Sequence, residues 1–101
     1  MCGIFGYVGN DRAYDIVKAG LHKLEYRGYD SCGICLQSND TFNITKAIGS
    51  TQELPANQSK STVGIGHTRW ATHGNVNLSN AHPHTSSCGS IVLVHNGVIE
   101  N

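Results

Sequence analysis

The sequence carries little charge and no cluster of basic residues. Lysine and arginine together number seven and aspartate and glutamate seven, so charged residues make up 14% of the 101 and the formal net charge is zero. Proteins that bind nucleic acid take much of their affinity from basic side chains that neutralise phosphates. We therefore expect no nucleic-acid partner.

Long apolar runs are absent as well. No segment has the length and hydrophobicity needed to span a bilayer, and the N-terminal residues lack the basic and apolar regions of a signal peptide. These absences predict no membrane partner and a cytoplasmic protein with reduced thiols. Repeats, low-complexity tracts and linkers are missing too, so we expect residues 1–101 to belong to a single domain.

The spacing of apolar residues predicts ordered elements along most of the chain. A helix is expected at 11–25, capped by Asn10 or Asp11, because apolar residues recur there at intervals of three and four. Residues 50–61 predict a loop or a short helix, and residues 68–88 form a long polar segment. Strands are expected at 3–9, 31–37, 41–48, 62–67 and 90–95, with a hairpin joining the second and third. The last of these is continuously apolar, which predicts a strand covered on both faces.

Cys2 directly follows Met1, so removal of Met1 would leave a thiol and a free α-amine on the same residue. The thiolate is the form of cysteine that attacks a carbonyl, and an α-amine titrates close to neutral pH. One residue would then supply both a nucleophile and a base. The alternative is a small buried residue near a terminus.

Two later segments carry groups suited to an amide substrate. In the first, the planar donor fork of Arg69 matches a carboxylate, and Thr72 and His73 add further donors. In the second, the side-chain N–H of Asn96 and the backbone N–H of Gly97 would form an oxyanion hole. The alternatives are a surface loop with an arginine salt bridge and an Asn-Gly turn that ends a strand.

Five segments, in their order and approximate spacing, resemble the class II glutamine amidotransferases. Within that group they are most similar to the glutamine–fructose-6-phosphate aminotransferases, and the resemblance covers essentially the whole chain. The segments are Met1–Ile4, Glu25–Ser31, His67–Gly74, Asn80–His84 and Val94–Asn101.

The resemblance implies an α+β fold with antiparallel sheets, part of the four-layer αββα sandwich of N-terminal-nucleophile hydrolases. It also implies that Cys2 attacks the amide of glutamine, that Asn96 and Gly97 bind the oxyanion, and that the α-carboxylate is held by Arg69, Thr72 and His73. Supporting roles fall to Arg27 near the nucleophile, to Trp70 on a loop that lines the site, and to His82 in the region that communicates with the rest of the enzyme.

The resemblance further implies what lies outside residues 1–101. Those residues would be the N-terminal part of the glutamine amidotransferase domain, and the sugar-isomerase part that binds fructose 6-phosphate would follow them. The complete enzyme would convert fructose 6-phosphate to glucosamine 6-phosphate with ammonia from glutamine. It would act as a homo-oligomer and would need no cofactor.

Several alternatives stay open. The chain could belong to a sister enzyme such as amidophosphoribosyltransferase, or be a truncated fragment without activity. Six histidines and four cysteines also allow a metal-binding module, although we expect no metal because compact pairs of ligands are lacking. Cys32 and Cys35 have the spacing of a redox or zinc dithiol, but residues three apart on a strand point to opposite faces. Cys88 is given no role.

Overall fold

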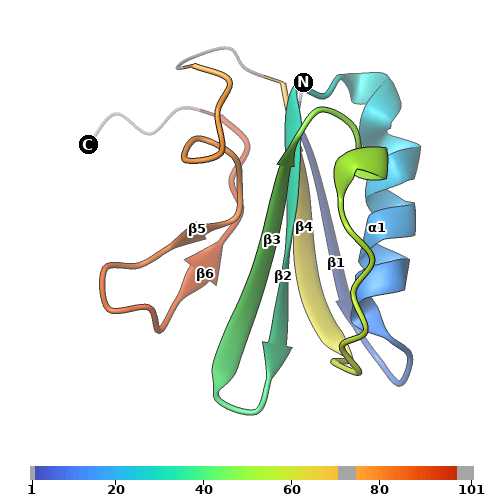
Figure 1. The fold of residues 1–101 in the computed structure, drawn as a ribbon, viewed down its shortest axis with the longest axis vertical. Helices are drawn as coiled ribbons and strands as arrows, with labels where there is room; N and C mark the ends of the chain where they lie inside the picture. The colour runs from blue at the N-terminus through green and yellow to red at the C-terminus, as the bar shows by residue number, and fades with distance from the viewer. Residues whose placement is uncertain (1, 71–74, 98–101) are drawn as a thin grey trace.

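The computed structural model describes residues 2–70 and 75–97, and its centre is a four-stranded antiparallel sheet (Figure 1). The strand order is β1-β4-β2-β3. The bounds are Gly3–Val8 for β1, Ser31–Ser38 for β2, Thr41–Ile48 for β3 and Val63–Arg69 for β4. All four strands expected in this part of the chain are thus confirmed, including the β2–β3 hairpin. Its turn places Asn39 at a φ of 55°, a conformation that asparagine tolerates better than most residues.

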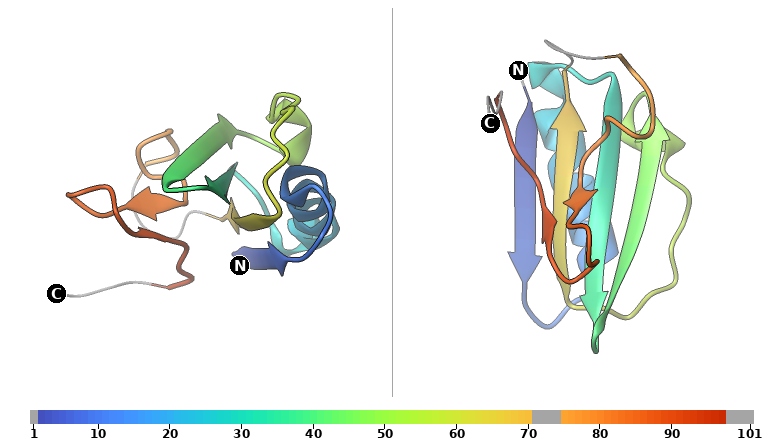
Figure 2. Two further views of the ribbon diagram at one scale, coloured as in Figure 1. Left: turned by 90° about the horizontal axis from the view of Figure 1, so that it is seen from below. Right: turned by 90° about the vertical axis from the view of Figure 1, so that its left-hand side faces the viewer.

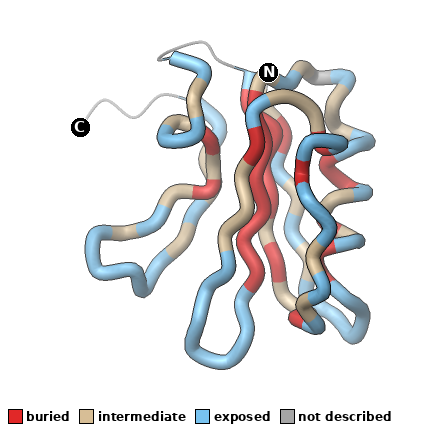
Figure 3. Tube along the Cα trace, viewed as in Figure 1, coloured by how far each residue is buried: buried red, intermediate tan, exposed pale blue. Residues whose placement is uncertain are grey.

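Helix α1 (Ala13–Leu24) packs across one face of this sheet. Its buried side, which includes Tyr14, Val17 and Leu21, forms the hydrophobic core with Ile34 and Leu36 of β2. Figure 3 shows the buried residues concentrated along β2, β4 and the inner side of the helix. The amphipathic helix that the sequence predicts at 11–25 is therefore confirmed.

The predicted cap of this helix is wrong. Neither Asn10 nor Asp11 occupies the N-cap position, which is taken by Arg12 without a side-chain capping bond. The N–H of Ala13 donates instead to the carbonyl oxygen of Ser61, at 2.8 Å. A helix start needs acceptors for its first N–H groups, and here a backbone carbonyl from the segment before β4 supplies one.

Two short 3₁₀ helices brace one end of the sheet, η1 (Glu25–Arg27) directly after α1 and η2 (Thr51–Glu53) after β3. A carboxylate oxygen of Glu25 accepts hydrogen bonds from both the backbone N–H and the hydroxyl of Thr51, each at 2.7 Å. The short helix allowed for in residues 50–61 is thus present, and one side chain ties it to the end of α1.

A second, two-stranded sheet lies on the face opposite α1, as Figure 2 shows. It pairs β5 (His84–Thr85) with β6 (Val92–Leu93). The approach is close: a Cβ added to Gly33 of β2 would lie 2.0 Å from the carbonyl oxygen of His82. An apolar cavity of about 150 Å³ separates the sheets further along, lined mainly by side chains of β2, β3, β4 and Val92. The order of layers is therefore helix, large sheet, small sheet.

The strand expected at 90–95 is shorter than predicted, and it is not covered on both faces. Only Val92 and Leu93 pair as a strand, and Ile91 and Leu93 are 60% and 46% exposed. Val92 lines the cavity against the large sheet, whereas its two neighbours turn away from it. The apolar run correctly predicted that a strand is present. It could not predict how far each face of the strand is buried, because burial depends on the neighbouring layers of the fold. Within the described part of the chain, no helix is long and apolar enough to cross a bilayer.

Candidate active site

Cys2 lies at the end of the large sheet, immediately before β1. The pairing of β1 with β4 reaches Gly3 and Thr68. Cys2 and Arg69 are therefore the next residues on their two strands. The Sγ atom of Cys2 accepts a hydrogen bond from the backbone N–H of Trp70 at 3.4 Å and lies 3.7 Å from the carbonyl oxygen of Trp70. A peptide N–H aimed at sulfur stabilises negative charge that develops there.

The side chain of Asn96 links Cys2 to the second half of the chain. Its Nδ2 donates to the carbonyl oxygen of Cys2 at 3.1 Å, and its Oδ1 lies 2.9 Å from Nε2 of His67. The same Nε2 lies 3.0 Å from the carbonyl oxygen of His95, an atom that can only accept. Nε2 therefore carries the proton. It follows that Asn96 turns its oxygen toward His67 and its NH₂ group toward Cys2.

Three histidine rings stack next to this hydrogen bond. The rings of His67 and His82 have centroids 4.0 Å apart, and His84 tilts onto His82 at 4.2 Å. Burial, reinforced by the neighbouring histidines, lowers the pKa of His82 to about 3. Its Nδ1 accepts a hydrogen bond from the backbone N–H of His95 at 3.3 Å. Burial also lowers the pKa of His67 and of His84, so the stack is uncharged at neutral pH.

Arg69 is held at the same end of the sheet as Cys2 and is only 7% exposed. Its carbonyl oxygen accepts from the N–H of Asp30 at 2.7 Å, and its Nη1 donates to the carbonyl oxygen of Asn75 at 2.9 Å. These two bonds fix the end of β4 and the guanidinium. A nearly buried arginine beside a thiol is a suitable group for the carboxylate of an amino acid.

Trp70 and Asn96 each form a hydrogen bond with Cys2, so the structure brings these three residues of the expected site together. Gly97 follows Asn96 with a φ of 120°, a conformation that glycine adopts without steric cost. His82 lies next to these residues because its ring stacks on that of His67. Three expected groups lie outside the described part of the chain, namely Thr72, His73 and the side chain of Arg27.

Comparisons with known proteins show which proteins this chain is similar to. No family model matches the chain. The chain is 58% identical, over its whole length, to the glutamine–fructose-6-phosphate aminotransferase [isomerizing] of Streptococcus agalactiae serotype III, and 54% identical to that of Listeria innocua serovar 6a. Each match covers 17% of the relative's length. The chain is homologous to the N-terminal region of these aminotransferases.

One solved structure is similar to this chain in fold. It is the glutamine phosphoribosylpyrophosphate (PRPP) amidotransferase from B. subtilis, complexed with ADP and GMP. The two structures have a TM-score of 0.69 and 29% sequence identity, over 86% of this chain and 19% of that one. The similarity confirms the α+β fold with antiparallel sheets.

The sequence pattern does not single out His67 as a residue of this site, although it opens the segment His67–Gly74. Its position in β4 carried a usable signal. In an alternating strand, His67 falls on the face opposite Gly66 and Thr68, whose side of the sheet packs against α1. Because the ring of His67 is also fully buried on that face, its polar atoms need hydrogen-bonding partners there.

Cys32 and Cys35 lie on opposite faces of β2, as expected for residues three apart on a strand. Cys32 faces α1 within the hydrophobic core, whereas Cys35 lines the cavity on the other face. Burial raises the pKa of Cys32 to about 12 and also raises the pKa of Cys35. Within residues 2–70 and 75–97, no three histidine, cysteine or acidic side chains gather where they could hold a metal ion.

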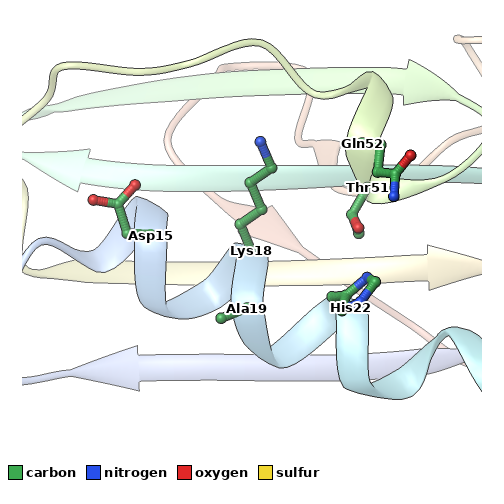
Figure 4. A pocket seen from close by; sticks show the side chains of 6 residues that line it. All are labelled: Asp15, Lys18, Ala19, His22, Thr51 and Gln52. Atoms are coloured by element: carbon green, nitrogen blue, oxygen red, sulfur yellow. The ribbon is translucent and has the colours of Figure 1, made fainter.

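A depression between α1 and η2 is lined mainly by polar residues, and its contacts are structural (Figure 4). Asp15, Lys18 and His22 come from successive turns of α1, and Thr51 and Gln52 lie opposite on η2. Two of its polar side chains already have partners. Nζ of Lys18 donates to the carbonyl oxygen of Leu54 at 3.1 Å, and Nδ1 of His22 lies 3.2 Å from Glu25. The first of these contacts ties the end of η2 to the helix.

Proposed function

We propose that residues 1–101 form the N-terminal part of a glutamine amidotransferase domain that hydrolyses the side-chain amide of glutamine. The ammonia released is then transferred to fructose 6-phosphate, which gives glucosamine 6-phosphate. Fructose 6-phosphate would be bound by a sugar-isomerase part outside these residues. The names of the relatives and their high identity support this proposal. The enzyme is proposed to act in the cytoplasm, as a homo-oligomer and without a cofactor.

The chemistry begins with Cys2 once Met1 has been removed. Its sulfur attacks the amide carbon of glutamine, and its α-amine takes the thiol proton, directly or through one water molecule. Nδ2 of Asn96 and the backbone N–H of Gly97 bind the resulting oxyanion. The proton passes to the departing nitrogen, so that ammonia leaves and a γ-glutamyl thioester remains. Water then cleaves the thioester to give glutamate.

One observation carries this proposal: Nδ2 of Asn96 points at the backbone of Cys2 and lies 3.1 Å from its carbonyl oxygen. Asn96 lies 94 residues from Cys2 in the sequence. The N–H of Trp70, from a third segment of the chain, binds the sulfur of Cys2. One donor on the sulfur and a second on the backbone of the same cysteine are an arrangement that suits an acyl-transfer site.

The remaining residues are assigned to substrate binding and support. Arg69, Thr72 and His73 would hold the α-carboxylate of glutamine, because a buried guanidinium flanked by neutral donors suits that group. Trp70 would line the site. Arg27 and His82 would support the nucleophile and the Asn96 segment.

Replacing Cys2 tests the proposal. We expect Cys2→Ala to lower glutamate release by at least about 1,000-fold, since a missing nucleophile removes the covalent route. The matched control is Cys88→Ala, which removes an exposed thiol and should keep wild-type turnover. Mass spectrometry of the active protein should show Cys2 as its first residue. Met1 retained on active protein, or full activity in Cys2→Ala, would overturn the mechanism.

A second acceptor is favoured by one observation, the structural similarity to the PRPP amidotransferase. Supplying fructose 6-phosphate and phosphoribosyl pyrophosphate separately distinguishes the two. Glucosamine 6-phosphate formed from glutamine supports the first proposal, and phosphoribosylamine supports the second. Absence of glutamate release with either acceptor indicates a fragment without activity, and stoichiometric zinc in the purified protein indicates a metal-binding module.

A further inference from the structure

We propose that His67 is a positioning residue, which holds the side-chain amide of Asn96 in the orientation that the oxyanion hole needs. This inference rests on the proposed function, because it assigns a further residue to the same hydrolytic site. His67 itself touches neither the sulfur of Cys2 nor its carbonyl in the contacts described above. It acts through Asn96.

The need for such a residue follows from the shape of an amide. The oxygen and the NH₂ group of Asn96 are nearly equal in size, so packing alone cannot decide which of them faces Cys2. Hydrogen bonding can decide it. Because Nε2 of His67 also donates to the carbonyl oxygen of His95, it presents a proton to Asn96. A flipped Asn96 would set two donors against each other at His67 and two acceptors against each other at Cys2.

The ring of His67 is itself well fixed. It lies on β4, is completely buried, and stacks on His82 with centroids 4.0 Å apart. The two histidines also hold the peptide groups of His95. Nε2 of His67 binds its carbonyl oxygen at 3.0 Å, and Nδ1 of His82 binds its N–H at 3.3 Å. Hydrogen bonds to both the N–H and the carbonyl oxygen of His95 therefore fix the backbone immediately before Asn96.

The surroundings of His67 favour the neutral ring with its proton on Nε2, which is the form that can donate to Asn96. Within the described residues, Nδ1 of His67 is buried without a hydrogen-bond partner. A protonated ring would carry an N–H there with no acceptor, so the neutral form with its proton on Nε2 is the one that fits. That form donates toward Asn96 and His95 at any pH where the ring stays neutral.

Four substitutions in the full chain, as its gene encodes it, test the inference through steady-state glutaminase kinetics. His67→Leu removes the donor and should lower kcat roughly 10- to 100-fold, with KM for glutamine changed by less than about 2-fold, because a misoriented oxyanion donor acts mainly in the transition state. His67→Gln places an amide N–H near the position of Nε2 and should restore most of kcat. His67→Asn is equally polar but too short to do so. His84→Leu removes a neighbouring histidine that does not bind Asn96, and should keep wild-type kcat.

A double-mutant comparison separates positioning from a general structural role. Asn96→Ala should lower kcat by roughly 100- to 1,000-fold. In that background His67→Leu should cost less than about 2-fold more, because the amide it orients is gone. Additive losses would show that His67 supports the fold instead and would overturn the inference. If His67→Leu fails to fold, the comparison of Gln with Asn decides, and equal kcat in those two variants overturns it.

The failure of this inference is distinguishable from the failure of the proposed function. If Cys2→Ala abolishes glutamate release while His67→Leu keeps wild-type kcat, the hydrolytic site stands and His67 has no part in it. If Cys2→Ala keeps its activity, the site itself is wrongly assigned and both proposals fall.

Discussion

The indole ring of Trp70 lies against the backbone of Gly28, the residue that ends η1. A Cβ built on Gly28 would fall 2.7 Å from Cε3 of Trp70. Gly28 also has φ 105° and ψ 150°, a backbone conformation that is essentially restricted to glycine. The glycine therefore makes room for the residue whose N–H binds the sulfur of Cys2, so Trp70 connects Gly28 to Cys2.

Gly28→Ala should disturb the site as well as the fold. We expect it to lower the free energy of unfolding by about 1–3 kcal/mol and to shift the fluorescence of Trp70, the only tryptophan in the sequence. The matched control is Gly89→Ala, which also has a positive φ but meets nothing within 4 Å. It should destabilise without changing the emission. Equal spectra for the two variants would contradict the contact.

Gly33→Ala tests the close approach of the two sheets. Its Cβ would meet the carbonyl oxygen of His82 at 2.0 Å, and a backbone atom cannot move aside cheaply. We expect a loss of about 1–3 kcal/mol in the free energy of unfolding, measured by urea titration. Gly6→Ala is the control, because its nearest contact would be at 3.9 Å. That change should stay within about 0.5 kcal/mol. Similar losses in both variants would refute the packing.

Stability should fall in mild acid because the buried histidines stay neutral. The pKa of His82 is lowered to about 3 in the folded state, so as the pH drops the unfolded state takes up its proton first. This contribution is fully present above a pH of about 6.5 and is lost by about 1.4 kcal/mol per pH unit below it. Between pH 7.5 and pH 5.0, His82 alone should account for at most about 2 kcal/mol.

Urea titrations at those two pH values measure the effect. His82→Phe keeps an aromatic ring in the stack and should flatten the pH dependence, although it also loses the bond from the N–H of His95. A wild-type slope in His82→Phe would show that other groups control acid stability.

The thiols outside the site should differ sharply in reactivity. Hydrogen bonds from Ser90, at 2.9 Å, and from Ser86 lower the pKa of the exposed Cys88 to about 7. Burial raises the pKa of Cys32 and Cys35, as described above. At pH 7.5 we expect iodoacetamide to label Cys88 within minutes and to leave Cys32 and Cys35 unlabelled until denaturant is added, as read by peptide mass spectrometry.

Ser90→Ala provides the control for this prediction. Removing the hydroxyl returns the pKa of Cys88 toward the ordinary value of a thiol, so its labelling should slow roughly 3- to 10-fold at pH 7. The protection of Cys32 and Cys35 should not change. Labelling of either core thiol at the rate of Cys88 would contradict the burial.

Local patterns predicted most of the large sheet and its helix. The spacing of Val17, Gly20 and Leu21 gave the helix its buried face, and the polar turn after Gln37 gave the hairpin. These features depend on residues close together in the sequence. The prediction of the helix cap was wrong because the N–H of Ala13 donates to the carbonyl oxygen of Ser61, which lies 48 residues away in the sequence. Backbone carbonyls leave no trace in the identity of a side chain.

The sequence indicates candidate residues for the site but not the contacts between them. The chemical types of Cys2, Arg69 and Asn96 and the motifs around them make these residues candidates. His67 is not indicated in this way, because its hydrogen bonds go to two acceptors, at His95 and Asn96, that only the folded chain brings to its Nε2. The burial of strand β6 could not be predicted for the same reason, because it depends on which parts of the fold pack against the strand.

The hydrogen bond between Asn96 and Cys2 spans 94 residues of sequence. At a synthesis rate of about 5–20 residues per second, the amide leaves the ribosome roughly 5–20 seconds after the cysteine. During that interval Cys2 of the nascent polypeptide lacks its hydrogen-bond donor on Asn96. The bond can form only once the segment around residue 96 has emerged and has folded back onto the N-terminus.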